Sequence, residues 1–122
     1  DLFIDSTGKL GYVSSVRASK INIAKLSSVS WLNQLAPVAF NYRKKDEREN
    51  YTDEPCEEIE YGLIAEEVEA VAPELCFYDF TDGEPELRGV HYHKLIAPLI
   101  QAVQELSTKN AALEARIAAL EA

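Results

Sequence analysis

The chain has 122 residues, with 12 Lys and Arg against 21 Asp and Glu, which gives a net charge of −9. A negative field of that size repels nucleic-acid phosphates and anionic lipid headgroups, and the short basic run at 43–45 is followed at once by acidic residues. With an ordinary hydrophobic content of 47%, the composition predicts one folded domain without a nucleic-acid or membrane partner.

The N-terminal stretch LFIDSTGKLGYV, residues 2–13, predicts a β-hairpin or the last rung of an upstream β structure. Apolar residues flank the turn-forming STG, and Gly8 can adopt a positive φ angle. Because the chain does not begin with Met, we expect it to be part of a longer polypeptide.

The next segment, YVSSVRASKINI at 12–23, contains a serine and a lysine, Ser15 and Lys20, five residues apart. A serine hydroxyl is a poor nucleophile until a base takes its proton, and a lysine amine can be that base only when burial keeps it neutral. A turn would bring Oγ and Nζ within hydrogen-bond reach, although the same spacing also fits an ordinary polar turn.

The middle of the chain predicts short helices and strands. Apolar spacing that stops at Pro37 predicts a helix from about Ser27 to Ala36, capped by Ser27 or Ser28. VAFNYR at 38–43 alternates as a half-buried strand does, and the charged stretch at 44–58 predicts an exposed loop.

Two further elements are expected before the C-terminal region. IEYGLIAEEVEAVAPEL at 59–75 has apolar residues near helical spacing and a proline close to its end, which predicts a second helix. Two β-prone runs around Asp82-Gly83 then predict a projecting hairpin.

The last thirty residues form a heptad pattern of mostly apolar positions, called a and d. The a positions are Ile96, Val103, Asn110 and Ile117, and the d positions are Leu99, Leu106, Leu113 and Leu120. Lys109 and Arg116 then fall at g, and Glu114 and Glu121 at the following e, where two parallel copies would pair them. The pattern favours oligomerisation over a helix that lies on its own domain. It leaves a dimer and a trimer open.

Conventional catalytic and cofactor motifs are absent from the sequence, and we expect no metal or other cofactor. His91 and His93 lie two residues apart on a predicted strand and would share one face, but no third ligand stands at a suitable spacing. Ordinary polar or interface histidines are therefore favoured over a metal site.

Three motifs carry a resemblance to a known family. SSVRASKINI at 14–23 resembles the S-S-D-x-R-x-K-x-N-I signature of the peptidase S74 family, the C-terminal intramolecular chaperone domains of bacteriophage tail spikes and tail fibres, including the endosialidases. YGLIAEEVEAVAPEL at 61–75 is similar to that family's second block, and VHYHKLIAPLIQAVQEL at 90–106 to the block that leads into its coiled coil. The three motifs stand in order and span most of the chain.

The resemblance implies an α+β fold, in which a small mixed head with a projecting β-hairpin is followed by a long C-terminal helix in a parallel trimeric coiled coil. Residues 1–14 would end an upstream β-stalk, 15–94 would form the chaperone head, and 95–122 the coiled-coil helix. The implied partners are two further copies and the upstream stalk of the same polypeptide. The implied location is a virion tail fibre or spike precursor that folds in the host cytoplasm.

The resemblance also implies a single-turnover serine endopeptidase that cuts its own chain. Ser15 would be the nucleophile, Lys20 the general base, and the bond between Ser14 and Ser15 the cleavage site. Arg17 and Asn22 are candidates to orient this site.

The sequence departs from the family signature at Val16, where the family usually has Asp. This departure favours a second hypothesis, a non-cleaving trimerisation and capping module that stays on the fibre. A third hypothesis is a generic coiled-coil adaptor with an acidic head, which requires residues 14–23 to be a plain loop.

Overall fold

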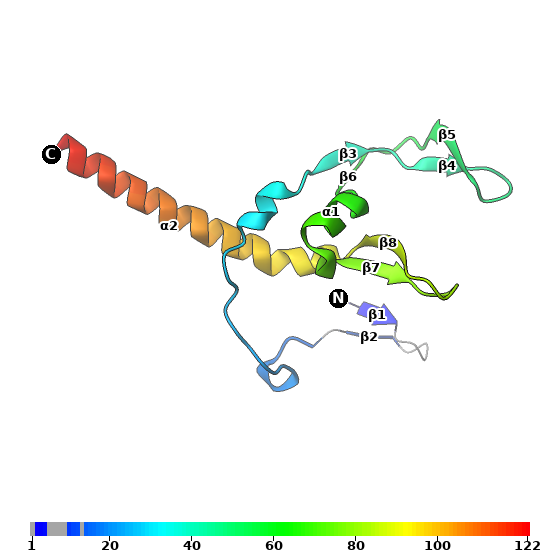
Figure 1. Ribbon diagram of the computed structural model, residues 1–122, viewed down its shortest axis with the longest axis horizontal. Helices are drawn as coiled ribbons and strands as arrows, with labels where there is room; N and C mark the ends of the chain where they lie inside the picture. The colour runs from blue at the N-terminus through cyan, green and yellow to red at the C-terminus, as the bar shows by residue number, and fades with distance from the viewer. Residues whose placement is uncertain (1, 5–9, 13) are drawn as a thin grey trace.

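The protein is described here by a computed structural model, which covers residues 2–4, 10–12 and 14–122. Small two-stranded antiparallel sheets and short helical turns precede the long helix α2 (Ile96–Glu121), and some of them form one core. Figure 1 shows α2 and the hairpin of β4 (Arg43–Lys45) and β5 (Tyr51–Pro55) projecting from this core in different directions. The predicted α+β class and the long C-terminal helix are confirmed.

The N-terminal strands β1 (Leu2–Ile4) and β2 (Leu10–Tyr12) pair antiparallel, with Leu2 opposite Tyr12. The pairing confirms the predicted hairpin, whose turn with Gly8 lies outside the described residues. After β2 the chain forms a single 3-10 turn, η1 (Arg17–Ser19), and then runs extended and exposed to the next element.

The helix predicted from Ser27 to Ala36 is wrong in type and length, since the chain forms a five-residue 3-10 helix, η2 (Ser30–Gln34). Neither predicted serine is its N-cap: that position is held by Val29, whose backbone N–H donates to Glu105 Oε1 on α2. The serine and asparagine side chains of this segment compete with the backbone for hydrogen bonds, which disfavours an α-helix. The contact between Val29 and Glu105 then marks the residue at which η2 begins.

The strand predicted at 38–43 divides in two, β3 (Val38–Phe40) and β4 (Arg43–Lys45). β3 pairs with β6 (Glu60–Gly62), and β4 pairs with β5 (Tyr51–Pro55). The stretch at 44–58 is exposed, as predicted, but it is largely a hairpin rather than a loop.

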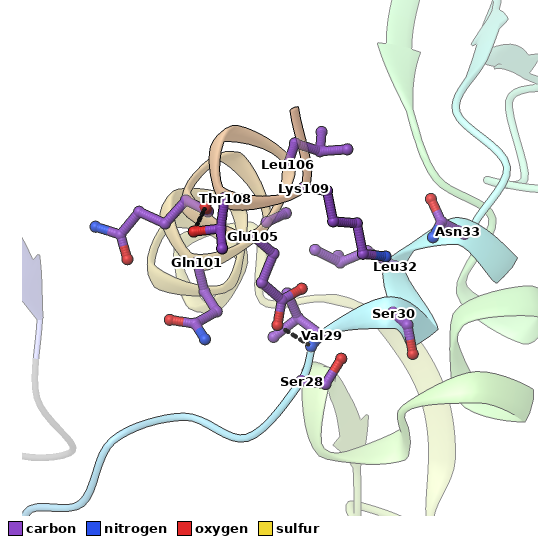
Figure 2. Close-up of a pocket in the computed structure, with 12 residues that line it drawn as sticks. Ser28, Val29, Ser30, Leu32, Asn33, Gln101, Glu105, Leu106, Thr108 and Lys109 are labelled. Carbon is purple, nitrogen blue, oxygen red and sulfur yellow. Dashed lines mark hydrogen bonds between the residues drawn. The ribbon is translucent and has the colours of Figure 1, made fainter. Parts of the chain in front are cut away.

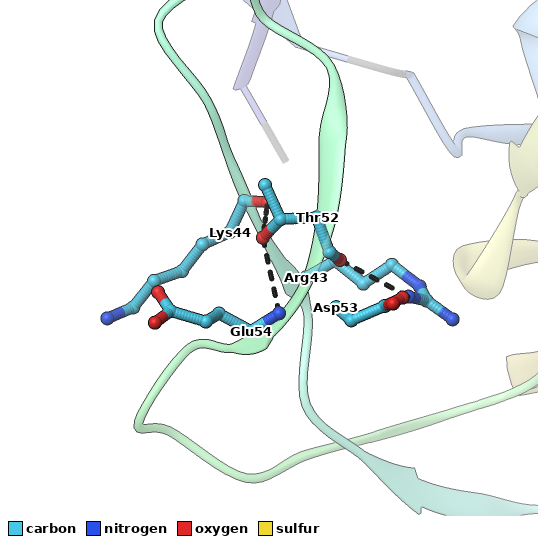
Figure 3. Close-up of polar contacts among 5 residues, drawn as sticks. All are labelled: Arg43, Lys44, Thr52, Asp53 and Glu54. Carbon is cyan, nitrogen blue, oxygen red and sulfur yellow. Dashed lines mark hydrogen bonds and ion pairs between the residues drawn. The ribbon is translucent and has the colours of Figure 1, made fainter.

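Side-chain contacts hold the β4–β5 hairpin together (Figure 3). Arg43 Nη1 lies 2.6 Å from Asp53 Oδ1, and Thr52 Oγ1 donates to the carbonyl of Lys44 at 2.8 Å. These polar contacts replace the apolar alternation that would have indicated strands in the sequence. For that reason the sequence alone predicts a loop here instead of a hairpin.

The core forms where helix α1 (Ala65–Val71) packs on strands β7 (Cys76–Asp79) and β8 (Glu86–Val90). The turn η3 (Pro73–Leu75) connects α1 to β7, and the turn η4 (Tyr92–Leu95) connects β8 to α2. The buried core side chains are Val68, Ala72, Leu75, Cys76, Val90 and Leu95.

The predicted second helix and the predicted hairpin are both confirmed, although α1 is shorter than the 59–75 pattern. Gly83 stands in the β7–β8 turn with φ of +89°, a conformation that favours glycine. No helix in the described part of the chain has the length and apolar character needed to cross a membrane.

Candidate active site and assembly surface

The predicted nucleophile lies at the start of a segment that we call the strap, residues 14–28, which is exposed along its length. Figure 1 shows the strap leaving the head near α2 and carrying η1 toward the β1–β2 hairpin. Apart from the η1 turn, the strap contains no helix or strand. Its shape is therefore set by a few local hydrogen bonds.

The η1 turn brings Ser15 and Lys20 together. The backbone N–H of Ser19 donates to the Val16 carbonyl at 3.1 Å, and that of Lys20 to the Arg17 carbonyl at 3.0 Å. The Ser19 hydroxyl also donates to the Val16 carbonyl, at 2.8 Å. With the chain folded back in this way, Lys20 Nζ donates a 2.8 Å hydrogen bond to Ser15 Oγ.

This geometry matches what a nucleophile and its base require, namely hydrogen-bond contact between the hydroxyl and the amine. In the single chain both side chains are exposed, and Nζ is the donor in the bond between them. A lysine acts as a general base only as the neutral amine, a form that burial favours. The two groups are thus within reach of each other, but neither is buried in the single chain.

The other predicted site residues surround this pair. Ser14 is exposed and directly precedes the nucleophile, and Arg17 is the first residue of η1. Asn22 has φ of +58°, in the left-handed region that asparagine tolerates better than most residues. Asn22 thus turns the backbone just after Lys20, which gives it a structural reason to be there.

The strap is anchored to α2 at its C-terminal end, through residues that the sequence did not single out. Val29 is 3% exposed, and its N–H donates to Glu105 Oε1 at 3.3 Å. Figure 2 shows this contact in a depression of about 470 Å³ between α2 and the start of η2. Since 76 residues separate the partners, no local pattern could have indicated the contact.

The apolar seam of α2 is open to solvent in the single chain. Of the seven apolar heptad residues, each is at least 52% exposed, and these are Ile96, Leu99, Val103, Leu106, Leu113, Ile117 and Leu120. A helix that served only its own domain would bury this face against the head. The exposed seam therefore favours association with further chains.

The histidine pair does not lie on a strand, contrary to the prediction, because β8 ends at Val90 and His93 belongs to η4. The two rings lie 5.4 Å apart, and His91 also contacts Phe77. Desolvation lowers the pKa of His91, as do the nearby charges of Lys94 and His93. Across residues 2–4, 10–12 and 14–122, no cluster of three or more His, Cys, Asp or Glu side chains is placed to hold a metal ion.

Comparison with known families finds a match to the peptidase S74 family, described as the chaperone of endosialidase, over residues 15–76. That range is just over half of the 122-residue chain and contains both Ser15 and Lys20. A search of curated proteins found no significant match.

Proposed function

The chain belongs to the peptidase S74 family, the chaperones of endosialidase, and on that premise we propose that it is a self-cleaving intramolecular chaperone. It trimerises, helps an upstream β-stalk of the same polypeptide to fold, and then cuts the bond between Ser14 and Ser15. The family description indicates a bacteriophage tail protein as its setting. The observation that carries the catalytic part is the 2.8 Å hydrogen bond between Lys20 Nζ and Ser15 Oγ.

The proposed reaction has two steps. Lys20, as the neutral amine, takes the proton from Ser15 Oγ while this oxygen attacks the carbonyl carbon of Ser14. The bond from this carbon to the Ser15 nitrogen breaks, the nitrogen receives the proton, and an ester joins Ser14 to Ser15 Oγ. Water then hydrolyses the ester, which leaves a carboxylate on Ser14 and a free amine and hydroxyl on Ser15.

The proposed assembly is a parallel trimer through the α2 seam. Its support is the exposed a/d face together with the g and e charges, Lys109 and Arg116 toward Glu114 and Glu121 of a neighbouring copy. Such a trimer brings three stalks into register before each stalk forms its own long-range contacts. In the proposed division, residues 1–14 belong to the stalk, 15–94 to the head and 95–122 to the coiled coil.

Release after folding gives the stalk kinetic stability. Once the chaperone has left, the stalk can unfold but can no longer be brought back into register, so its persistence depends on the unfolding barrier. Cleavage in this scheme happens once and within the same chain.

A second candidate function is supported by Val16, which replaces the acidic residue of the family signature. In this alternative the same head and seam trimerise and cap the fibre without cutting it. The Ser15–Lys20 contact would then be an ordinary polar turn.

The experiment that separates the two is intact mass under denaturing conditions, on the chain expressed with its native upstream segment. We expect wild type to separate into two pieces, the smaller beginning at Ser15, and Ser15→Ala to remain whole. Lys20→Arg should also remain whole, because a guanidinium keeps the charge but cannot serve as a base. Ser27→Ala, an exposed serine of the same strap, is the matched control and should be cut like wild type.

An uncut wild-type chain that still trimerises would contradict self-cleavage and support the permanent cap. Cleavage in Lys20→Arg at the wild-type rate would remove Lys20 from the reaction.

A further inference from the structure

The strap has the composition of a docking segment. Its charged residues are Arg17, Lys20 and Lys25, all cationic, in a chain whose net charge is −9. Between these cations stand Ile21 and Ile23, whose side chains are 86% and 56% exposed. None of the three cations forms an ion pair with a residue that the structure describes. The strap therefore presents apolar side chains flanked by positive charge.

A matching surface lies on the head. An apolar groove of about 560 Å³ runs between η2, the β3–β6 sheet and the start of α2, and its walls include Leu35, Val38, Tyr61, Leu63, Tyr92 and Leu99. Tyr61, on β6, is 84% exposed. A groove of this kind offers burial to aliphatic side chains such as those of the strap.

Negative charge lies in the segment that leads into β6, the strand whose Tyr61 lines this groove. Glu57 and Glu58, both exposed, precede β6 in the chain. Asn41 Nδ2 donates to the carbonyls of Cys56 at 3.1 Å and Glu58 at 2.9 Å, which fixes the acidic run next to β3. The head thus offers an apolar groove and, in the segment before one of its walls, carboxylates, which together complement the isoleucines and cations of the strap.

The anchor at Val29 directs the strap away from the groove of its own chain. Val29 is fixed to Glu105 on α2, and Figure 2 shows the preceding chain running in the direction opposite to η2, which lines the groove. Leu99 belongs both to the groove and to the heptad seam. A copy that pairs through the seam is therefore brought next to the groove.

From these observations we propose that the strap of one chain docks in the groove of a second copy. Ile21 and Ile23 pack against Tyr61 and the neighbouring apolar walls, and the strap cations face Glu57 and Glu58. This inference rests on the proposed trimer and names the surface that completes the cleavage site. The docked neighbour covers the Ser15–Lys20 pair, which is the burial that a neutral lysine needs.

The test is photo-cross-linking in the full chain, made with Ser15→Ala so that the upstream segment stays attached. A benzophenone amino acid replaces Ile21, which is 86% exposed in the single chain. Unlabelled and ¹⁵N-labelled chains are mixed before assembly, irradiated, digested and analysed by mass spectrometry. We expect cross-links that join residue 21 of one label to a peptide with Tyr61 or Leu99 of the other label.

Two matched variants sharpen the result. The same probe at Glu84, in the exposed β7–β8 turn, should give no cross-link to the groove peptides. Tyr61→Lys should lower the mixed-label yield by about tenfold, because it removes the aromatic wall and sets a cation against the cationic strap.

Cross-links found only within one label, only to the upstream segment, or not at all would overturn the inference. The wild-type cleavage and the trimer mass are measured separately. If both stand while the mixed-label cross-link is missing, the docking inference alone is wrong.

Discussion

Val16 precedes the η1 turn and occupies its N-cap position, where a side-chain oxygen usually accepts a backbone hydrogen bond. A valine cannot do so, and its side chain is 64% exposed, so it gains little from packing in the single chain. Among the described residues, the turn that brings Lys20 to Ser15 is therefore held by the backbone bonds and by the Ser19 hydroxyl. This residue is where the rate of cleavage is set in our account.

Restoring a capping side chain should accelerate cleavage. We expect Val16→Asp to raise the first-order rate of self-cleavage by about fivefold, since an N-cap oxygen contributes about 1 kcal/mol to the turn that forms the pair. The measurement is the uncut fraction against time by denaturing gel. Val16→Asn is the matched control, because it caps without a charge and should give the same gain.

A gain with Asp alone would assign the effect to charge rather than capping. An unchanged rate in both variants would contradict a limiting role for the turn.

For single residues, the sequence indicates the Ser15–Lys20 pair but not the contacts that support it. Ser15 and Lys20 were within reach by spacing, and the structure joins them through one turn. The left-handed backbone at Asn22 and the Glu105 anchor could not be read from spacing. The first depends on local backbone geometry, and the second joins residues from opposite ends of the chain.

Among the elements, α1 and β7 are joined at the edge of the core by a hydrogen bond between side chains. The phenol of Tyr78 donates to Glu69 Oε2 at 2.7 Å. That hydrogen bond, desolvation and the charge of Glu69 raise the pKa of Tyr78 from 10.0 to about 12. Between pH 10 and about 12, Tyr78 therefore keeps its proton in the folded state and loses it in the unfolded chain.

This contact predicts a loss of stability in alkali. Below pH 10 the tyrosine is protonated in both states, and the contribution is complete; between pH 10 and about 12 the unfolded state binds fewer protons, so the free energy of unfolding falls as pH rises. We expect Tyr78→Phe to unfold at lower temperature at neutral pH and to lose less stability over this interval. Thermal unfolding followed by circular dichroism measures both, and parallel pH profiles of the two proteins would contradict the contact.

The α2 seam predicts a second result at the scale of elements. We expect Leu113→Ala to weaken association by about 3 kcal/mol per copy, the usual cost of truncating a buried leucine. In a trimer this loss sums to about 9 kcal/mol over two association steps, so that dissociation begins at a concentration more than about a thousandfold higher. Ala115→Gln changes the opposite side of the same helix and should leave association unchanged. Sedimentation velocity over a dilution series measures both. Equal dissociation of the two variants would show that the seam is not the interface.

Elements with an apolar period were predictable, and those held by polar or distant contacts were not. The heptads of α2 and the Asp82-Gly83 hairpin could be recognised because period and turn chemistry are local signals. The β4–β5 hairpin was read as a loop because it is stabilised by exposed contacts such as Arg43 with Asp53. The short η2 was read as an α-helix because its N-terminal end is set by Glu105, 76 residues away.

At the scale of the whole molecule, a small core supports several exposed apolar and charged surfaces. The buried residues come mainly from α1, β7, β8 and the turns beside them, while the seam of α2 and the isoleucines of the strap remain exposed. Such surfaces are costly in an isolated chain and indicate protein association. In our account further copies of the chain cover them, and cleavage follows assembly.

The measurement that tests this account most directly is native mass spectrometry of wild type expressed with its upstream segment. We predict a released species whose mass is that of three copies of residues 15–122, beside a stalk that ends at Ser14. A trimer of this mass would test three parts of the account at once: association through the α2 seam, the action of the Ser15–Lys20 pair, and the position of the cleavage site. An uncut chain in any oligomeric state, or a released piece of one copy that never formed a trimer, would contradict the account.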